Sequence, residues 1–384
     1  MPASLPSRGY GRTVPRRFPI PDCRFPLTAL AAVFVACSSK PPPDYAPDPA
    51  LVEQIEELRI YAPDAVCPGR TIEAEYEAIL ADGRRIPFAT DYDDDHPPPL
   101  HVVFLRLSSA QAEAEGDGDW DTQRDPLRSA MDGFQLHAEL RARPSVSVDG
   151  MVAPEYSCLP NAFRFDGRRG ERGQGGHTGP DVVVRLDILS SPFYDELLVA
   201  GVEVGSAPPF YVVYDASLIP PSDFLVIESR GGRGGRGPDG EDGAAGQAGE
   251  DGCPGGTGGA GGAGGSGGPG GPGGPGGHVT VIVPSDEPFL AGLVDARSPG
   301  GPGGRGGAAG AGGPGGPGGE GTVVDRRRCA DGAAGPDGAD GRAGPEGPAG
   351  SSGPRAQVIP VSRDDVFGPR APVTLRALVD YSRN

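Results

Sequence analysis

The chain has 384 residues and a formal net charge of −18, with 66 glycines, 45 prolines and only 6% aromatic residues. Glycine and proline at this level are typical of collagen-like or low-complexity structure, and the scarcity of aromatic residues excludes a large conventional core. The acidic balance argues against nucleic acid as a partner, because its phosphate groups would be repelled.

Residues 1–36 are predicted to be an export signal. Five arginines precede an uncharged apolar run from Leu27 to Ala36, which is too short to span a bilayer but suits the core of a signal peptide. An ordinary secretory signal is one interpretation. The run ends in FVAC, however, and this motif resembles the lipobox of bacterial lipoproteins, in which cleavage occurs before a cysteine that is then acylated.

This resemblance implies that Cys37 carries lipid and attaches the protein to a membrane of the bacterial envelope, at the outer membrane or the cell surface. Residues 37–50 are rich in proline and suit an extended tether after the lipidated cysteine. Because the chain is strongly acidic, we expect attachment through the acyl chains and not through charge.

Residues 51–166 are predicted to form an antiparallel β-sandwich-like domain. Residues 70–80 and 134–142 alternate apolar and polar side chains with the period of two of a half-buried strand. Residues 100–107 are a third predicted strand, and a short helix is expected over residues 50–58.

Residues 167–384 are predicted to be a glycine-rich domain with interspersed strands. Two strands, residues 356–362 and 373–381, are expected to close the chain. Glycine recurs at every third residue in four blocks, the longest with sixteen triplets in phase: residues 167–181, 231–278, 301–321 and 332–355.

Three structures fit such blocks, namely a collagen triple helix, a bundle of polyglycine-II helices within one chain, and a flexible linker, which needs no phase. Ten of the sixteen triplets in the longest block are Gly-Gly-X. A second glycine adds no side chain to a collagen helix, but it gives an extended helix a second bare edge for close packing. The pattern therefore favours an intrachain antiparallel bundle over a collagen-like homotrimer or disorder.

The lengths of the blocks also favour a bundle. If the longest block folds back near Cys253, it becomes two rods, residues 231–252 and 255–277, that match the rods formed by residues 301–321 and 332–355. Each rod would be roughly 65–75 Å long at about 3.1 Å per residue. Both turns, and with them Cys253 and Cys329, would then lie at the same distal end.

Four cysteines remain after Cys23 and Cys37 are set aside. Export implies an oxidising compartment, and four cysteines there permit three pairings. The rod arrangement favours Cys253–Cys329, and Cys67 and Cys158 flank the strands of the first domain. We therefore predict the disulfides Cys67–Cys158 and Cys253–Cys329.

The glycine-rich part resembles the polyglycine-II bundles of the snow-flea antifreeze protein and of phage tail-fibre tips, and the chain resembles bacterial collagen-like (Gly-X-Y repeat) lipoproteins. The resemblance covers residues 167–355 and the lipobox. Charged side chains on the rods argue against ice binding. In tail-fibre tips the loops at the bundle end contact a receptor, and this resemblance implies a contact surface that includes Glu250, Asp251, Arg326, Arg327 and Arg328.

No catalytic constellation or cofactor motif is recognisable, and none of the five histidines has metal-ligand spacing. Accordingly, no cofactor is expected. Two acidic loops alternate aspartates as calcium-binding loops do, but they lack the glycine and the final glutamate of such loops. The weak candidates for metal ligands are Asp91, Asp93, Asp95, Asp117, Asp119 and Asp121.

Together these features predict a mainly β fold that carries a bundle of polyglycine-II helices. The expected function is that of a non-enzymatic surface lipoprotein, structural or adhesive and monomeric, that projects a rigid glycine-helix bundle. One alternative is a trimeric collagen-like stalk with β trimerisation segments, and a remote alternative is an exported hydrolase.

Overall fold

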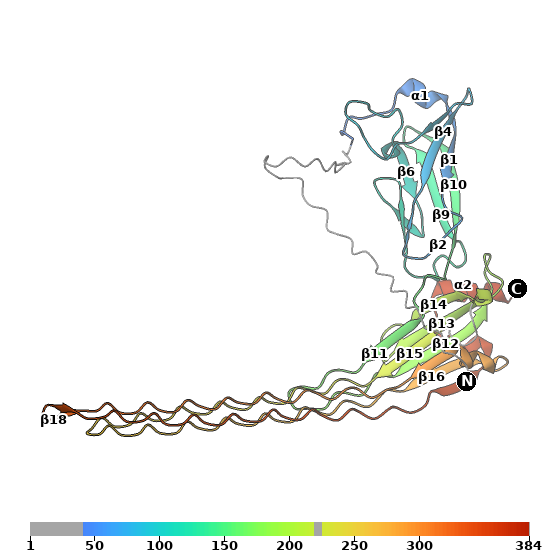
Figure 1. The fold of residues 1–384 in the computed structure, drawn as a ribbon. Coiled ribbons are helices and arrows are strands. Elements are labelled where there is room, and N and C mark those ends of the chain that lie inside the picture. Colours follow the sequence, from blue (N-terminus) through green and yellow to red (C-terminus); the bar gives the residue numbers. More distant parts are fainter. Residues whose placement is uncertain (1–40, 219–224, 384) are drawn as a thin grey trace, which may run out of the picture.

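The computed structural model describes residues 41–218 and 225–383. The predicted signal peptide, residues 1–36, and the predicted lipid-bearing Cys37 lie outside the described residues. The described chain is mainly β and has three parts: a first β domain, a second β domain, and a long narrow shaft that projects from the second domain (Figure 1).

The first β domain contains three small sheets. One antiparallel sheet has the order β1 (Ile55–Tyr61), β4 (Glu75–Leu80) and β5 (Arg85–Pro87). A second has the order β2 (Ala65–Val66), β10 (Arg143–Pro154), β9 (Phe134–Leu140) and β6 (Leu105–Ser108). The third has the order β3 (Thr71–Ile72), β8 (Trp120–Thr122) and β7 (Ala112–Ala114). Two short helices complete the domain, α1 (Pro49–Gln54) and the 3-10 helix η1 (Val102–Phe104).

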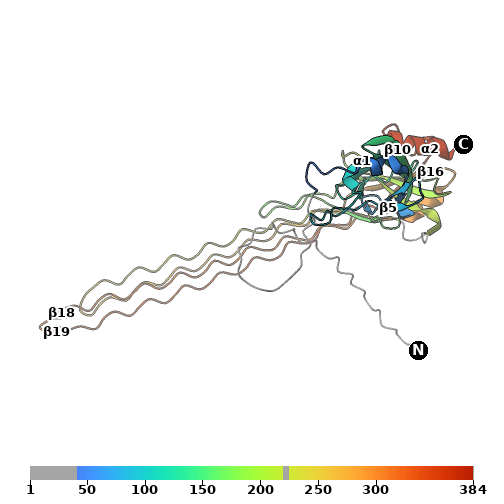
Figure 2. The same cartoon turned by 90° about the horizontal axis from the view of Figure 1, so that it is seen from above.

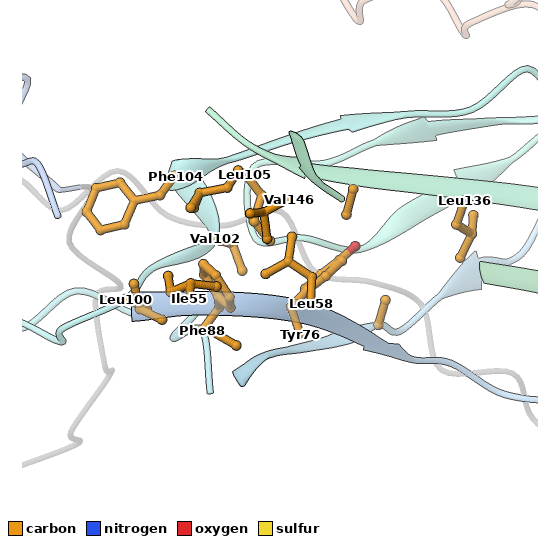
Figure 3. Packing of buried hydrophobic residues seen from close by; sticks show 14 of the residues in the cluster. Ile55, Leu58, Tyr76, Phe88, Leu100, Val102, Phe104, Leu105, Leu136 and Val146 are labelled. Atoms are coloured by element: carbon orange, nitrogen blue, oxygen red, sulfur yellow. The ribbon is translucent and has the colours of Figure 1, made fainter. Parts of the chain in front are cut away.

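Apolar side chains from these sheets pack into one core (Figure 3). Trp120 is fully buried, and its Nε1 donates to the hydroxyl of Tyr76, which in turn donates to the carbonyl of Gly118, both at 2.8 Å. The buried polar atoms of the two large aromatic residues are therefore paired. A disulfide, Cys67–Cys158, joins β-domain segments whose Cα atoms lie 6.4 Å apart.

Three predictions for this domain need correction. The helix expected over residues 50–58 ends at Gln54, because β1 pairs with β4 from Ile55 onward. The strand expected over residues 70–80 is divided between β3 and β4, which belong to different sheets. The strand expected over residues 100–107 begins as η1 and becomes β6 only at Leu105.

The second β domain consists of two sheets packed face to face. The larger has the order β14 (Phe210–Asp215), β13 (Leu197–Val204), β12 (Val182–Leu189), β16 (Val279–Pro284) and β20 (Gln357–Val361). The smaller has the order β11 (Ala162–Asp166), β15 (Leu225–Arg230) and β17 (Val294–Arg297). Leu225 and Ile227 of the smaller sheet pack against alternate residues of β12, β13 and β16. Short 3-10 helices connect the strands: η2 (Ala216–Leu218), η3 (Pro288–Leu293) and η4 (Arg363–Asp365).

The chain closes with a helix, α2 (Val373–Ser382), so the strand predicted over residues 373–381 is wrong. Leu375 and Leu378 are fully buried, and their spacing puts them on one helical face. This face covers the outer side of the larger sheet in a cluster that also contains Leu127 and Tyr156 of the first domain. The helix therefore stabilises the contact between the two β domains.

β11 also revises the predicted domain boundary. Residues 162–166 were expected in the first domain, but β11 runs parallel to β15 in the smaller sheet. The first domain therefore ends before β11, after β10 has finished at Pro154.

The shaft is a continuation of the two sheets. Residues 167–173, 231–252 and 298–321 leave β11, β15 and β17 and run outward, and we call them the outgoing segments. Residues 174–181, 255–278 and 331–355 run back into β12, β16 and β20, and we call them the returning segments. Each returning segment enters the sheet opposite the one that its outgoing partner left, so each shaft hairpin connects the smaller sheet to the larger one.

Candidate functional site: the shaft and its tip

Backbone hydrogen bonds join neighbouring segments of the shaft at every third residue. Along residues 231–252, for example, Gly231 donates to Pro299, Gly234 to Pro302 and so on to Gly252, which donates to Glu320, at 2.8–3.1 Å. These two outgoing segments run parallel. Residues 255–278 run antiparallel to residues 231–252, and here Gly256 donates to Glu250 and Gly274 to Gly232.

The two inner segments, residues 255–278 and 298–321, differ in composition from the two outer ones. Among the four long segments, each inner one is hydrogen-bonded to the other three, whereas residues 231–252 and 331–355 are bonded to the inner pair and not to each other. Near the base, residues 231–252 are also bonded to the two short segments. The inner segments carry two glycines in nearly every triplet, and residues 332–355 carry one. Two glycines per triplet are therefore found in the segments that have the larger number of neighbouring segments.

Residues 231–252 change composition along their own length in the same way. The first two triplets are Gly-Gly-Arg, and a Cβ at Gly232 or Gly235 would overlap the carbonyl of Arg168 or Glu171 in the short outgoing segment. That short segment ends at Gly173. From Pro238 onward the second position carries a side chain, because no third neighbour lies against it.

Aspartates bind the backbone of residues 298–321. The carboxylates of Asp239, Asp242 and Asp251 accept from the N–H groups of Ala308, Ala311 and Glu320 at 2.7–2.8 Å. Where residues 231–252 instead carry Arg233, Ala245 and Ala248, the residues opposite are Pro302, Pro314 and Pro317, which have no N–H to satisfy. At these six positions aspartate and proline are thus alternative ways of leaving no backbone donor unpaired; the exception along the seam is Arg236, which lies opposite Arg305.

Replacing Asp242 with alanine is expected to lower the free energy of unfolding of the shaft by about 1 kcal/mol, because the N–H of Ala311 loses a charged acceptor. Glu241→Ala is the matched control, since it removes the same charge from the neighbouring position. Guanidinium unfolding of the mature chain measures both. An equal loss of stability in the control variant would show that the loss comes from the change in net charge and not from the hydrogen bond between Ala311 and Asp242.

The tip of the shaft joins both long hairpins. β18 (Val323–Val324) and β19 (Arg327–Arg328) form a small hairpin whose turn residues, Asp325 and Arg326, have φ of 50° and 60°. Two successive positive φ values are typical of the tight hairpin turn that matches strand twist. The second disulfide, Cys253–Cys329, links this hairpin to the turn after Gly252, and the N–H of Thr322 donates to the carbonyl of Gly252 at 2.8 Å.

The predicted contact residues of the tip therefore lie at one end of the shaft. In Figure 2 the labels β18 and β19 mark this end. The five residues are exposed: Glu250, Asp251, Arg326, Arg327 and Arg328. Asp331 behind them accepts from the N–H of Gly321 at 2.7 Å and lies 3.5 Å from Arg328, and these two interactions lower the pKa of its carboxyl group. Val323 and Val324 add exposed apolar surface beside the arginines.

Four of the six weak metal candidates accept hydrogen bonds from within the first domain. Asp93 and Asp117 accept from the backbone N–H two residues further on, and Asp121 accepts from the hydroxyl of Thr71. Burial first, and then neighbouring carboxylates, raise the pKa of Asp119. Over residues 41–218 and 225–383 there is no group of three or more His, Cys, Asp or Glu side chains placed to hold a metal ion.

One polar row on the four-stranded sheet was not singled out by its sequence pattern. Register places Ser108, His137 and Asp149 side by side on β6, β9 and β10, and His137 Nδ1 lies 2.7 Å from Asp149 Oδ1. A catalytic triad needs a carboxylate shielded from water, but the Asp149 side chain is 86% exposed. The row is therefore better described as a solvent-facing ladder of polar residues.

Asp187 is a buried carboxylate within the otherwise mostly apolar strand β12. The sequence pattern did not indicate that this side chain would be buried. Its side chain is 2% exposed and lies 3.8 Å from Arg363, which also contacts Asp286 and Glu287. Burial raises the pKa of Asp187 to about 6, and the charge of Arg363 opposes this rise.

Asp187 is expected to make the protein less stable as the pH rises from about 4 to about 6. The folded chain holds the proton more tightly than the unfolded chain, so the stabilisation is complete below the unfolded pKa and is lost through the folded pKa. Asp187→Asn should weaken this dependence, whereas Asp166→Asn, at an exposed position whose carboxylate pairs with Arg164, should preserve it. Melting temperatures at pH 4.5 and 7.5 test this. An unchanged pH difference in Asp187→Asn would contradict it.

Comparison with protein-family models, with curated proteins and with solved structures returned no match. In the part of the chain that the structure describes, no helix combines the length and the apolar character needed to cross a membrane.

Proposed function

We propose that this protein is a non-enzymatic surface lipoprotein, structural or adhesive, that projects a rigid bundle of polyglycine-II helices from a β base. The observation that carries the proposal is the continuity of sheet and shaft. Six strands of one chain extend into six segments that are hydrogen-bonded side by side, and the four long segments are closed at the far end by Cys253–Cys329.

The hydrogen-bond pattern supports polyglycine-II helices in particular. Donors recur at every third residue, and an extended helix with three residues per turn returns the same side to its neighbour at that interval. Its rise of about 3.1 Å per residue gives the long segments a length of about 70 Å. Bonds run between parallel and antiparallel neighbours alike, whereas the three chains of collagen are all parallel.

The surface of the shaft supports a monomer. Bare backbone that can bind another extended segment is a risk for lateral association, much as an open sheet edge is. The outer segments carry side chains such as Glu241, Gln247 and Glu250 where the inner segments carry glycine. These side chains would keep a second shaft at a distance.

The roles of the two ends follow from the same arrangement. Acylated Cys37, followed by the proline-rich tether, would hold the β base at the membrane of a bacterial envelope. The shaft would then present the exposed tip, with Arg326, Arg327 and Arg328, at a distance from that membrane. A structural spacer and an adhesive element share this geometry, and the tip makes an adhesive contact possible.

The proposal is tested with the mature protein recovered from a bacterial envelope in detergent. We expect incorporation of labelled fatty acid that is lost in Cys37→Ala, the molar mass of one chain by light scattering, and a projection of about 70 Å in electron micrographs. The mass of three chains would favour the trimeric collagen-like stalk instead. Absence of the label would show that the protein carries no lipid anchor, and the lipoprotein part of the proposal would then be wrong.

A further inference from the structure

Arginines gather at the base of the shaft on three adjacent outgoing segments. We call the group the arginine face and define it by five exposed residues: Arg169, Arg172, Arg233, Arg236 and Arg305. In the sequence they belong to three separate blocks, and in a chain with a net charge of −18 they stand out only when the blocks are placed together.

Backbone hydrogen bonds fix the rows of this face. Gly173, which follows Arg172, donates to the carbonyl of Arg236 at 2.8 Å, and Gly237, which follows Arg236, donates to the carbonyl of Arg305 at 2.9 Å. Arg172, Arg236 and Arg305 therefore form one row across three segments.

The second row is built in the same way. Gly170, which follows Arg169, donates to the carbonyl of Arg233 at 2.8 Å. This row lies one triplet nearer the β base, about 9 Å away at the rise of an extended helix. Four of the five arginines directly precede a glycine that donates to the next segment, and the carbonyl of Arg305 accepts from Gly237 as the carbonyl of Arg236 accepts from Gly173. Parallel segments with the same period turn equivalent positions to the same side.

Little negative charge balances this face. Of its five arginines only Arg236 has a carboxylate in ion-pair contact within the described residues, namely Asp239 at 2.8 Å. Further along the same segment, Asp242 and Asp251 occupy the same triplet position, but their carboxylates accept from backbone N–H groups. Like charges side by side are destabilising, so a bound anion would relieve a repulsion that the free protein carries.

We propose that the arginine face binds an anionic polysaccharide laid across the outgoing segments. Guanidinium groups bind carboxylate, sulfate and phosphate oxygens through paired hydrogen bonds, and two rows of them suit a polymer that carries many such groups. A single-stranded nucleic acid is a poorer fit, because no Phe, Tyr or Trp for base stacking occurs in the six segments.

A second copy of the chain is also a poorer fit, because the aspartates that share this face are already bonded to the backbone. The inference depends on the assembled shaft proposed above. It does not depend on the lipid at Cys37 or on contacts made by the tip, so it can fail while the proposed function holds.

The test measures binding of the mature chain to dextran sulfate, with uncharged dextran of equal length and oligo-dT as comparison polymers. One variant replaces a complete row, Arg172→Gln, Arg236→Gln and Arg305→Gln. The matched control replaces three exposed arginines of the two β domains, Arg128→Gln, Arg370→Gln and Arg376→Gln, and so makes the same change in net charge. Circular dichroism and the intact Cys253–Cys329 disulfide confirm that both variants are folded.

We expect the wild type to bind dextran sulfate and not dextran, with an affinity that falls as salt rises. The row variant should lose at least tenfold in affinity and the control variant less than twofold. Equal losses in both variants, or no binding by the wild type at physiological salt, would overturn the proposal. Binding of oligo-dT as tight as that of dextran sulfate, lost in the row variant, would reassign the face to nucleic acid.

Discussion

Replacing Gly313 with alanine is expected to destabilise the shaft by about 3–5 kcal/mol. A Cβ at this position would overlap the carbonyl oxygen of Ala244 in an outer segment. The N–H of Gly313 donates to Gly262 and its carbonyl accepts from Gly338, both at 2.8 Å, so a shift of this residue disturbs all three neighbouring segments. No flexible side chain is nearby that could move aside, because every contact is with backbone.

The matched control is Gly292→Ala in η3, where a Cβ would meet no atom within 4 Å. It makes the same chemical change in a helix, where alanine is the better residue. Guanidinium unfolding followed by circular dichroism, with limited proteolysis of the glycine-rich segments, separates the two variants. Equal stability of Gly313→Ala and the wild type would mean that the segments are not in backbone contact.

Removing the distal disulfide by Cys253→Ser and Cys329→Ser is expected to cost about 4 kcal/mol, because the bond closes a long loop in the unfolded chain. The two cysteines are 76 residues apart, and in the described part of the chain their bond is the only side-chain cross-link between the two long hairpins. We expect fraying to begin at the tip, where β18 and β19 depend on that link, and to spread toward the base.

The other disulfide provides the control, since Cys67 and Cys158 are 91 residues apart and would be expected to give a similar loss from loop closure alone. Its removal should weaken the first domain and leave the tip resistant to protease. Hydrogen exchange along residues 231–252 and 331–355 distinguishes the two effects. Fast exchange near the tip in both double variants would contradict a local role for Cys253–Cys329.

Some features of the fold follow directly from the sequence. Strict alternation in residues 134–140 produced β9, with every second side chain buried. Both disulfide pairings were also predictable, Cys253–Cys329 from the matched lengths of the glycine-rich segments and Cys67–Cys158 from the position of these cysteines on either side of the strands of the first domain.

Other features depend on contacts that no local pattern encodes. Residues 373–381 are too short for periodicity to distinguish a strand from a helix, and burial of Leu375 and Leu378 against the larger sheet decides for α2. The arginine face has the same origin, because Arg172, Arg236 and Arg305 come together only through the register of three segments. The ion pair of Asp187 with Arg363 was likewise not predictable, because the two residues are far apart in the chain.

The repeat of three residues along the shaft has a consequence for how such a protein can vary. If one triplet were deleted from each of the four long segments, the remaining glycines would still pair in the same register. The shaft would be one triplet shorter, and the tip hairpin, the distal disulfide and the β base would be unchanged. The reach of the molecule can thus change in increments of about 9 Å while both ends stay as they are. A deletion in one segment alone would shift the register of that segment relative to the other three. Length is therefore adjustable only as a coordinated property of four stretches of sequence.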